Sequence, residues 1–470
     1  MKTLRTPEDD RRHHLLSDIL SDCCLKIGLD DEAESYLRSI PKEFRNVKTY
    51  MKLGDIYFKC NKSKEAVSCY QEVLKLDRYA ISAVDKLIKL GLPEDKKKNL
   101  NEFYKKDDWL VKLVDVKFFT YNNNHDKLLK TLTQLDRSFP NNVHLKLNLA
   151  ECYDQLSKYD QAINLFKQCR QLDGFTDMKM STYATLLQTT GHPTELQDLS
   201  QKLLETNKGS AECWLVLAIY YTSRSTILSA INEENNEANN IAMFKNMDLA
   251  NKAVDKALEL NNSFVLAYLW KGHLLLMNQQ YARAIMVYKQ AKTISTDIRI
   301  YQGLVKAYLS STQQFQDALN MARMAQKVHS AKHDYKPHIL LGSVYTMKEE
   351  LHDNAQKEFE TAMKICEETN NEFGLEETLL GKVELDIKRQ QYDVAISTLN
   401  NSPKLKQNTD IIQTKLGQIY LLQQRFEDAF QCFHKALSLN RFNEIARQEL
   451  MKLEESIPNN EEGEEEYDMA

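Results

Sequence analysis

The chain has 470 residues, about three times the length of an average domain, so it forms either several domains or one elongated array of repeats. Only 13 glycines and 8 prolines occur, less than half their usual combined share of roughly 12%, which excludes a protein of many short strands and turns. The 62 basic and 67 acidic residues give a net charge of −5, which argues against a general nucleic-acid binder. We therefore predict an all-α protein with no nucleic acid among its partners.

The two ends of the chain differ from its body. Residues 1–14 are charged and lack the apolar stretch of a secretion signal, and no apolar run approaches the ~18 residues of a membrane span. Residues 454–470 hold eight acidic and no basic side chains, so the acidity belongs to this tail. We expect a flexible N-terminus over 1–14, a disordered acidic tail over 454–470 and no membrane contact.

Between these ends, residues 15–453 show a repeated two-helix pattern. An aromatic-x-x-Leu-Gly-x-x-Tyr segment, followed by Ala-x-x-x-aromatic, is typical of a tetratricopeptide hairpin of two antiparallel helices, A and B. The pattern or its main positions occur over residues 50–70, 149–166, 268–291, 341–362 and 416–436.

One position of helix B sets the register of the whole array. Five of the ten steps between successive copies of this anchor are 34 residues, the length of one tetratricopeptide unit. Two longer steps reflect a shortened repeat over 79–103 and an exposed polar insertion between helices over about 224–243, and a single helix over 442–453 closes the array. The anchors are Ala33, Ala66, Leu128, Ala162, Leu196, Ala250, Ala284, Ala318, Ala355, Ala395 and Ala429. We predict a right-handed α-solenoid of about twelve stacked tetratricopeptide hairpins with a capping helix.

Small residues recur at two structural positions of the hairpins. We expect the glycine of helix A to face the anchor alanine of helix B, so that the two backbones approach closely. The clearest of these positions are Gly54, Ala66, Ala162, Gly272, Ala284, Gly342, Gly417 and Ala429.

Motifs for catalysis are missing from the sequence. It contains no phosphate-binding glycine loop, nucleophile elbow or zinc-protease motif, and its nine cysteines include no C-x-x-C pair. The best metal candidates are His329 and His333, with Asp334 and His338 nearby, but an exposed helix end accounts for them better. We predict no catalytic residue, no metal, no cofactor and no enzymatic activity.

Two further features have a simpler explanation than a binding site. Lysines 96–98 and 105–106 could attract an acidic peptide, but acidic residues interleave with them, as in a solvated loop. His273 is expected on the inner face of the array, where a lone histidine is more often packed or hydrated than catalytic.

The surface that helices A present on the inner side of such an array is the remaining candidate site. Its apolar bias suits an extended or helical segment of a partner, although some of these side chains could instead contact the neighbouring repeat. The candidates are Lys48, Met51, Phe58, Leu147, Glu151, Leu215, Ile219, Leu269, His273, Leu276 and Met277.

Several segments resemble one family. They cover residues 33–41, 108–110, 211–214, 269–272, 301–305 and 436–439, followed by the acidic C-terminus. In this order, over about residues 15–455, the chain resembles the tetratricopeptide scaffold subunits of the anaphase-promoting complex (cyclosome), a cell-cycle ubiquitin ligase.

The resemblance implies a non-catalytic subunit that stacks on other tetratricopeptide subunits and assists binding of activator or substrate peptides. It also implies localisation in the nucleus and cytoplasm, and self-association into a homodimer as one further assembly. Ubiquitin transfer would lie with cullin and RING subunits.

Two alternatives stay open at this point. One is a sister tetratricopeptide subunit of the same complex. The other is a stand-alone peptide-binding adaptor such as a chaperone cofactor, against which the lack of a spaced Lys/Asn/Lys/Arg clamp argues. We do not expect a transferase with a catalytic domain after the repeats, because only a hairpin, a cap and the tail remain after Ala429.

Overall fold

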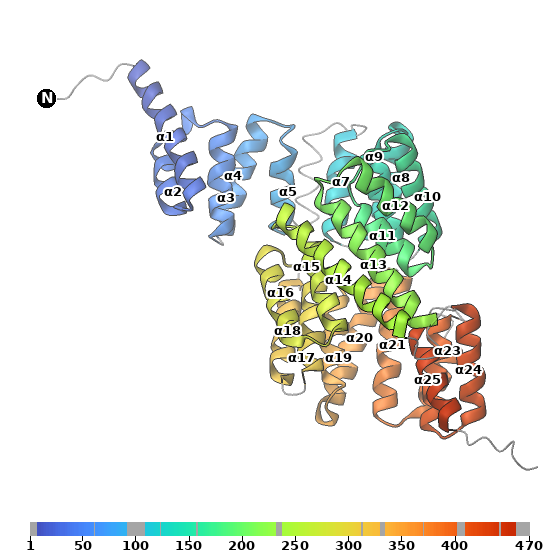
Figure 1. The fold of residues 1–470 in the computed structure, drawn as a ribbon. Coiled ribbons are helices and arrows are strands. Elements are labelled where there is room, and N and C mark those ends of the chain that lie inside the picture. The colour runs from blue at the N-terminus through green and yellow to red at the C-terminus, as the bar shows by residue number, and fades with distance from the viewer. Residues whose placement is uncertain are drawn as a thin grey trace, which may run out of the picture. The chain divides into compact units, whose positions relative to one another are not determined.

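The computed structural model describes residues 7–456 except 61, 92–108, 123, 157, 232–236, 312–313, 330–333, 370, 402–408 and 441–442. The described residues form α-helices joined by short turns, and no strand occurs among them (Figure 1). The chain divides into two compact units, residues 1–138 and 139–470. The predicted all-α solenoid of tetratricopeptide repeats is confirmed.

The first unit begins earlier than the repeat pattern suggests. Helix α1 starts at Pro7, so residues 7–14, which we expected to precede the array, are already helical. The third hairpin is described only for α5, and residues 92–108 lie outside the described residues. The elements are α1 (Pro7–Ile27), α2 (Asp30–Ser39), η1 (Lys42–Phe44), α3 (Val47–Lys59), α4 (Ser63–Leu76), α5 (Ile81–Lys89), α7 (Trp109–Tyr121) and α8 (His125–Ser138).

The second unit continues the alternation of helix A and helix B and ends in a single helix. Its elements are α9 (Val143–Gln155), α10 (Tyr159–Leu172), α11 (Met180–Thr189), α12 (Pro193–Thr206), α13 (Ala211–Ile231), α14 (Glu237–Leu260), α15 (Val265–Met277), α16 (Tyr281–Ile294), α17 (Ile298–Ser310), α18 (Phe315–His329), α19 (Lys336–Tyr345), η3 (Glu349–Leu351), α20 (His352–Glu368), α21 (Glu372–Lys388), α22 (Tyr392–Asn401), α23 (Asp410–Leu422), α24 (Phe426–Leu439) and α25 (Glu444–Ser456).

The anchor positions confirm the predicted register. Every anchor lies in helix B of its hairpin, and ten of the eleven are 0% exposed. The exception is Leu128, which is 6% exposed. A position that is buried at each repeat must stay small or apolar, because larger or polar groups there would cost packing or desolvation energy.

The partner of the helix A glycine differs from our expectation. A Cβ atom on Gly54 would lie 2.6 Å from the Tyr70 ring, which stands one helical turn after the anchor Ala66. Gly272, Gly342 and Gly417 meet an aromatic ring in the same way: Tyr288, Phe359 and Phe433, respectively. The glycine therefore makes room for a buried ring instead of facing the alanine, because a ring reaches further across the hairpin than a methyl group does.

The polar insertion is also different from a simple exposed loop. Helices α13 and α14 have 21 and 24 residues, whereas the next pair, α15 and α16, have 13 and 14. The extra residues thus lengthen both helices of one hairpin. Residues 232–236, the centre of the insertion, lie outside the described residues.

The closing helix α25 covers the last hairpin. Ala446, Leu450 and Leu453 are buried against it, whereas Ile445 is 55% exposed. The reason is its place one residue before Ala446, which turns its side chain by about 100° around the helix. Of the acidic tail, residues 457–470 lie outside the described residues.

Candidate functional site

Helices of the second unit line a pocket of about 490 Å³, which we call the groove pocket. Its residues come from α9, α10 and α11, from α15 and α16, and, four hairpins after α9, from α17. It is lined by Asp154, Tyr159, Ser181, Thr182, Thr185, Leu186, Thr189, Leu266, Leu269, Trp270, His273, Leu276, Tyr288, Arg299, Gln302, Gly303 and Lys306. The pocket thus combines an apolar part with a few charged groups, as ligand sites in proteins commonly do.

The apolar part of the groove pocket belongs mainly to α15. Leu266, Leu269, Trp270 and Leu276 share its pocket-facing side, since they follow one another at helical spacing. The Trp270 ring stands edge-on to His273, with ring centroids 5.6 Å apart. An apolar side chain of a partner could be buried here against an aromatic surface.

The Tyr288 ring forms the floor between α15 and α17. It is 3% exposed, and a Cβ atom on Gly272 or Gly303 would lie 2.3 or 2.4 Å from it. Only glycine at both positions lets two helices close on the same ring. Burial raises the pKa of the Tyr288 hydroxyl, which therefore stays protonated at neutral pH.

The charged part of the pocket joins α9 and α17. On α17, the Arg299 Nη2 atom lies 2.6 Å from the Asp297 carboxylate. On α9, Glu151 is paired with Lys179. Asp154 has a different environment: burial, and then the charge of Glu151, raise its pKa to about 6, although Arg299 and Lys336 act in the opposite direction.

His273 lies where the groove pocket meets a second recess. Its pKa is lowered because the walls shield it from bulk water and because Lys306 adds a positive charge, so the imidazole is neutral at pH 7. The second recess has a volume of about 910 Å³ and is lined by Trp270, His273 and Met277 together with the ends of α11, α13 and α24. A neutral histidine here can donate or accept a hydrogen bond.

The structure divides the predicted groove residues into three groups. Leu269, His273 and Leu276 line the groove pocket, and Met277 lines the second recess beside it. Glu151 is half-buried next to them in its ion pair with Lys179.

Three predicted groove residues face the wrong way. Leu147 is 1% exposed, and Leu215 and Ile219 are 0% exposed, because all three pack into the core between neighbouring hairpins. This is the alternative contact that the sequence left open, and these residues cannot touch a partner while the core is intact.

The remaining candidates belong to the first unit. Lys48 is exposed on α3, and Met51 is half-buried against the core. Phe58 is half-buried, with the Lys86 ammonium 5.3 Å from its ring centroid. None of these three residues lines the groove pocket.

Sequence reasoning did not select the groove pocket's charged residues or its tryptophan. Asp154, Arg299 and Lys306 stand at ordinary positions of amphipathic helices, where charge is usually solvated. Trp270 occurs in a segment that carries the family resemblance. The one available signal was a large aromatic residue on helix A, two positions before Gly272.

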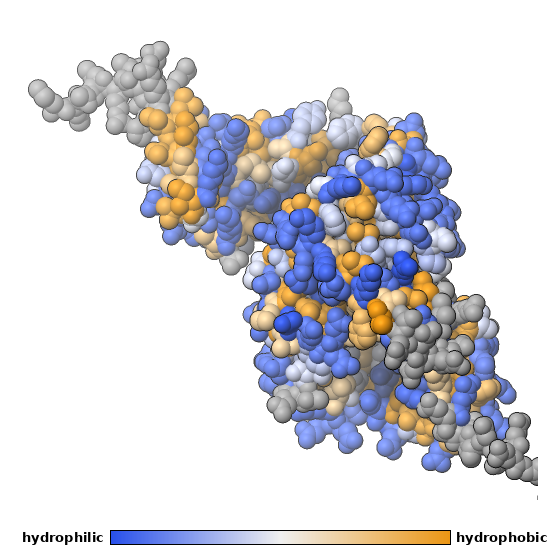
Figure 2. Space-filling view, viewed as in Figure 1, coloured by the Kyte–Doolittle hydropathy of each residue, from blue (hydrophilic) through white to orange (hydrophobic). Residues whose placement is uncertain are grey.

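The first unit carries a second candidate surface, the outward face of α1. We define this α1 face by Leu15, Leu16, Ile19, Leu20 and Ile27. Their exposed fractions run from 44% for Leu20 to 75% for Ile27. Figure 2 shows hydrophobic residues gathered at this helix. Apolar side chains at this density on one helix face indicate a contact surface.

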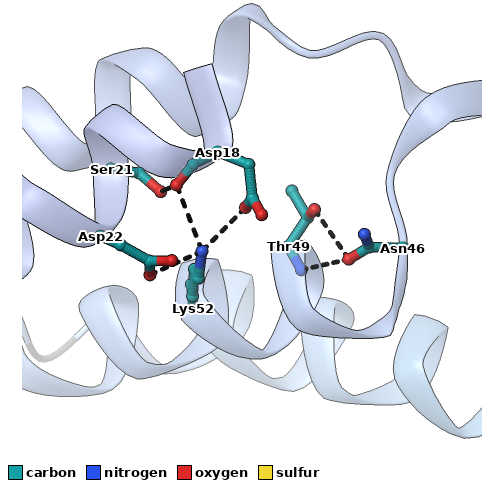
Figure 3. A network of polar contacts seen from close by, with 6 residues as sticks. All are labelled: Asp18, Ser21, Asp22, Asn46, Thr49 and Lys52. Atoms are coloured by element: carbon teal, nitrogen blue, oxygen red, sulfur yellow. Dashed lines mark hydrogen bonds and ion pairs between the residues drawn. The ribbon is translucent and has the colours of Figure 1, made fainter. Parts of the chain in front are cut away.

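A partly buried polar network holds the opposite side of α1 in place. The Lys52 Nζ atom of α3 lies 2.8 Å from Asp18 Oδ1 and 2.7 Å from Asp22 Oδ1 of α1 (Figure 3). Burial alone would lower the pKa of Lys52, but these two carboxylates raise it, so the lysine is charged. With Asn46 capping α3 through Thr49, the network fixes which face of α1 points outward.

The histidine pair considered for metal binding is not arranged as one site. His329 is buried instead of lying at an exposed helix end: its Nε2 atom is 2.9 Å from the Thr296 carbonyl oxygen, and its ring stands edge-on to Tyr301. His338 Nδ1 lies 2.7 Å from Glu358. His333 lies outside the described residues, as do the lysines at 96–98 and 105–106. Within the described ranges, no three potential ligands are grouped for a metal ion.

The described helices also give no membrane segment. None of them combines the length and the apolar character that crossing a bilayer requires.

Together, the paired helices, buried anchors and ring-facing glycines define a tetratricopeptide-repeat protein. Family models described as tetratricopeptide repeat match residues 47–79, 145–173 and 412–443. Each matched segment coincides with one hairpin: α3–α4, α9–α10 and α23–α24.

Within this class, the chain is similar to anaphase-promoting complex subunit 7. It is 25% identical to the protein of that name from Dictyostelium discoideum over 453 residues, which are 93% of this chain and 73% of the relative. It is 25% identical to the Arabidopsis thaliana protein over 409 residues, which are 84% of this chain and 67% of the relative.

A solved structure shows the same fold. A chain of the APC/C hetero-tetramer Cut9-Hcn1 matches with a TM-score of 0.55 and 19% sequence identity, over 95% of this chain and 85% of that chain. The match extends the fold assignment to nearly the full length of the chain.

Proposed function

We propose that this protein is a non-catalytic tetratricopeptide scaffold subunit of an anaphase-promoting complex, in the role of subunit 7. The observation that carries the proposal is the 25% identity to subunit 7 over 93% of the chain. Every anchor position is buried along the same length, so the likeness covers the folded array and not one repeat. The chain would stack on other tetratricopeptide subunits and act in the nucleus and cytoplasm.

Two features favour this role over the alternatives. A stand-alone chaperone cofactor would need a basic clamp for an acidic tail, whereas the groove pocket places Asp154 beside Arg299 and Lys306. Sister subunits of the same complex also match over 84% and 85% of this chain, but those matches cover only 45% and 57% of the relatives. The two subunit 7 matches cover 73% and 67% of theirs.

We assign two contact surfaces to this role. The groove pocket would receive a segment of an activator, a substrate or another subunit. The α1 face would bind a second copy of the chain, because a symmetric contact covers the same apolar face on both partners. The ion pairs of Lys52 to α1 hold that face outward.

The test of the scaffold role is native affinity purification of the tagged chain, with mass spectrometry of the retained proteins. We expect cullin-type, RING-type and other tetratricopeptide subunits in comparable amounts. The variant Ala284→Phe, which opens a buried anchor, serves as the structural control and should retain fewer of them. Recovery of chaperones alone, or of one unrelated partner, would contradict the scaffold role and leave the fold assignment intact.

A further inference from the structure

The groove pocket contains a carboxylate without a partner. Asp154 is half-buried, yet its carboxylate makes no hydrogen bond or ion pair within the part of the chain that the structure describes. Its neighbours differ: Glu151 is paired with Lys179, and Asp297 with Arg299. A carboxylate that has lost water without gaining a donor is destabilised, so a ligand that supplies a donor gains binding energy.

Donors without a partner line the same pocket. Arg299 binds Asp297 through its Nε and Nη2 atoms, and its Nη1 group has no hydrogen bond to a described residue. Arg299 and Asp154 influence each other electrostatically, but they are not within ion-pair distance. The pocket therefore presents an acceptor from α9 and a donor from α17 with a space between them.

Charge on a ligand would be unfavourable at this point. A cation bound to Asp154 would face the positive charges of Arg299 and Lys336, which already act on that carboxylate. An anion bound to Arg299 would face Asp154 and Asp297. A neutral group that has both an N–H and a C=O satisfies both sides without either repulsion, and the peptide amide is such a group.

We propose that the groove pocket binds an extended, uncharged peptide segment, with one main-chain N–H donating to Asp154 and a neighbouring C=O accepting from Arg299. An adjacent apolar side chain of the segment packs on Leu269, Trp270 and Leu276. In an extended chain the N–H and C=O groups point sideways while side chains alternate, which allows both contacts at once. The proposal rests on the groove as the partner-binding surface of the scaffold and specifies the chemistry of the partner.

The test uses the purified full-length chain and a phage-displayed library of random linear 12-residue peptides. We expect enrichment of sequences with an uncharged core that contains Leu, Ile, Met or Phe. Enrichment should be lost on Asp154→Ala and on Trp270→Ala. The matched control Glu205→Ala changes an exposed acid on α12 outside the pocket and should select the same sequences as the wild type.

The strongest selected peptide then allows a thermodynamic cycle. Trp270 reports binding by fluorescence when Trp109 and Trp214, the other two tryptophans, are replaced by phenylalanine. We expect Asp154→Ala to weaken binding about tenfold, the usual effect of losing a hydrogen bond to a charged group. N-methylation of one backbone nitrogen in the peptide should cause a similar loss with the wild type and little further loss with Asp154→Ala.

Three results would overturn the proposal. The first is a charged residue, Lys, Arg, Asp or Glu, at an aligned position of the selected sequences. The second is the absence of enrichment above the Trp270→Ala background. The third is an N-methylation effect that is the same in the wild type and in Asp154→Ala. Because the test needs no other subunit, its outcome is separate from the scaffold role. If the chain selects uncharged peptides but retrieves no subunits, the proposal for the pocket stands and the scaffold role is contradicted.

Discussion

In the first unit five exposed apolar side chains share one face of α1, whereas in the second unit apolar side chains line recesses beside charged groups. Both units bury the same anchor positions, so the repeat chemistry is shared. The two surfaces differ because their helices have different numbers of neighbours. Helix α1 is the first helix of its unit, whereas α15 has helices packed on both sides. One repeat pattern can thus leave an exposed apolar face on one helix or enclose a pocket that combines apolar and charged groups.

The largest effect is expected from breaking the repeat chemistry of the second unit. Ala284 is 0% exposed, so Ala284→Phe must force α15 and α16 apart. We expect a loss of about 3 kcal/mol in the free energy of unfolding, at the upper end for overpacking. Urea unfolding followed by circular dichroism measures it. An unchanged midpoint would show that the anchor register is wrong at this hairpin.

A smaller loss is expected from the glycine that faces Tyr288. A Cβ atom on Gly272 would lie 2.3 Å from the ring, so Gly272→Ala should cost about 2 kcal/mol despite the better helix propensity of alanine. The matched control is Gly209→Ala, where the nearest atom is 4.0 Å away. Thermal unfolding of both variants measures the difference. Adding Tyr288→Leu to Gly272→Ala should restore part of the loss, and a lack of any recovery would contradict the ring contact.

These glycines and anchors could be predicted because burial at a fixed period leaves a direct trace in sequence. The groove residues could not be predicted in the same way. Whether Leu215 and Ile219 face a groove or a neighbouring hairpin depends on how each hairpin is rotated, and the lengthened α13 lies deep in the core. Asp154 and Arg299 line the same pocket because the array of helices curves over four hairpins, and no sequence spacing encodes that curvature.

The first unit is tested through its α1 face. Ile19 is 57% exposed, so Ile19→Glu should leave the fold stable but place two charges in a symmetric contact. We expect at least a tenfold weaker self-association, measured by sedimentation equilibrium of the purified chain. Met286→Glu, at 60% exposure on α16, is the control of similar exposure in the second unit. Equal effects of both changes, or a wild-type chain that stays monomeric, would remove the α1 face as a dimer surface.

The smallest effect concerns Asp154, and its direction distinguishes a binding residue from a stabilising one. Folding raises its pKa to about 6, so the charged carboxylate costs stability above pH 6, and that cost falls progressively as the pH drops from 6 to the ordinary aspartate value of about 4. Asp154→Asn removes the cost and should therefore raise the free energy of unfolding at pH 7.5 by about 1 kcal/mol, allowing for partial solvent contact. The gain should fall to about a third of this value near pH 4.5, whereas the exposed control Asp198→Asn should show none at either pH. Thermal unfolding at both pH values measures this. If Asp154→Asn is destabilised at pH 7.5, Asp154 already has a partner in the fold. If it is stabilised, the chain keeps a carboxylate that lowers its stability and that a ligand would have to satisfy.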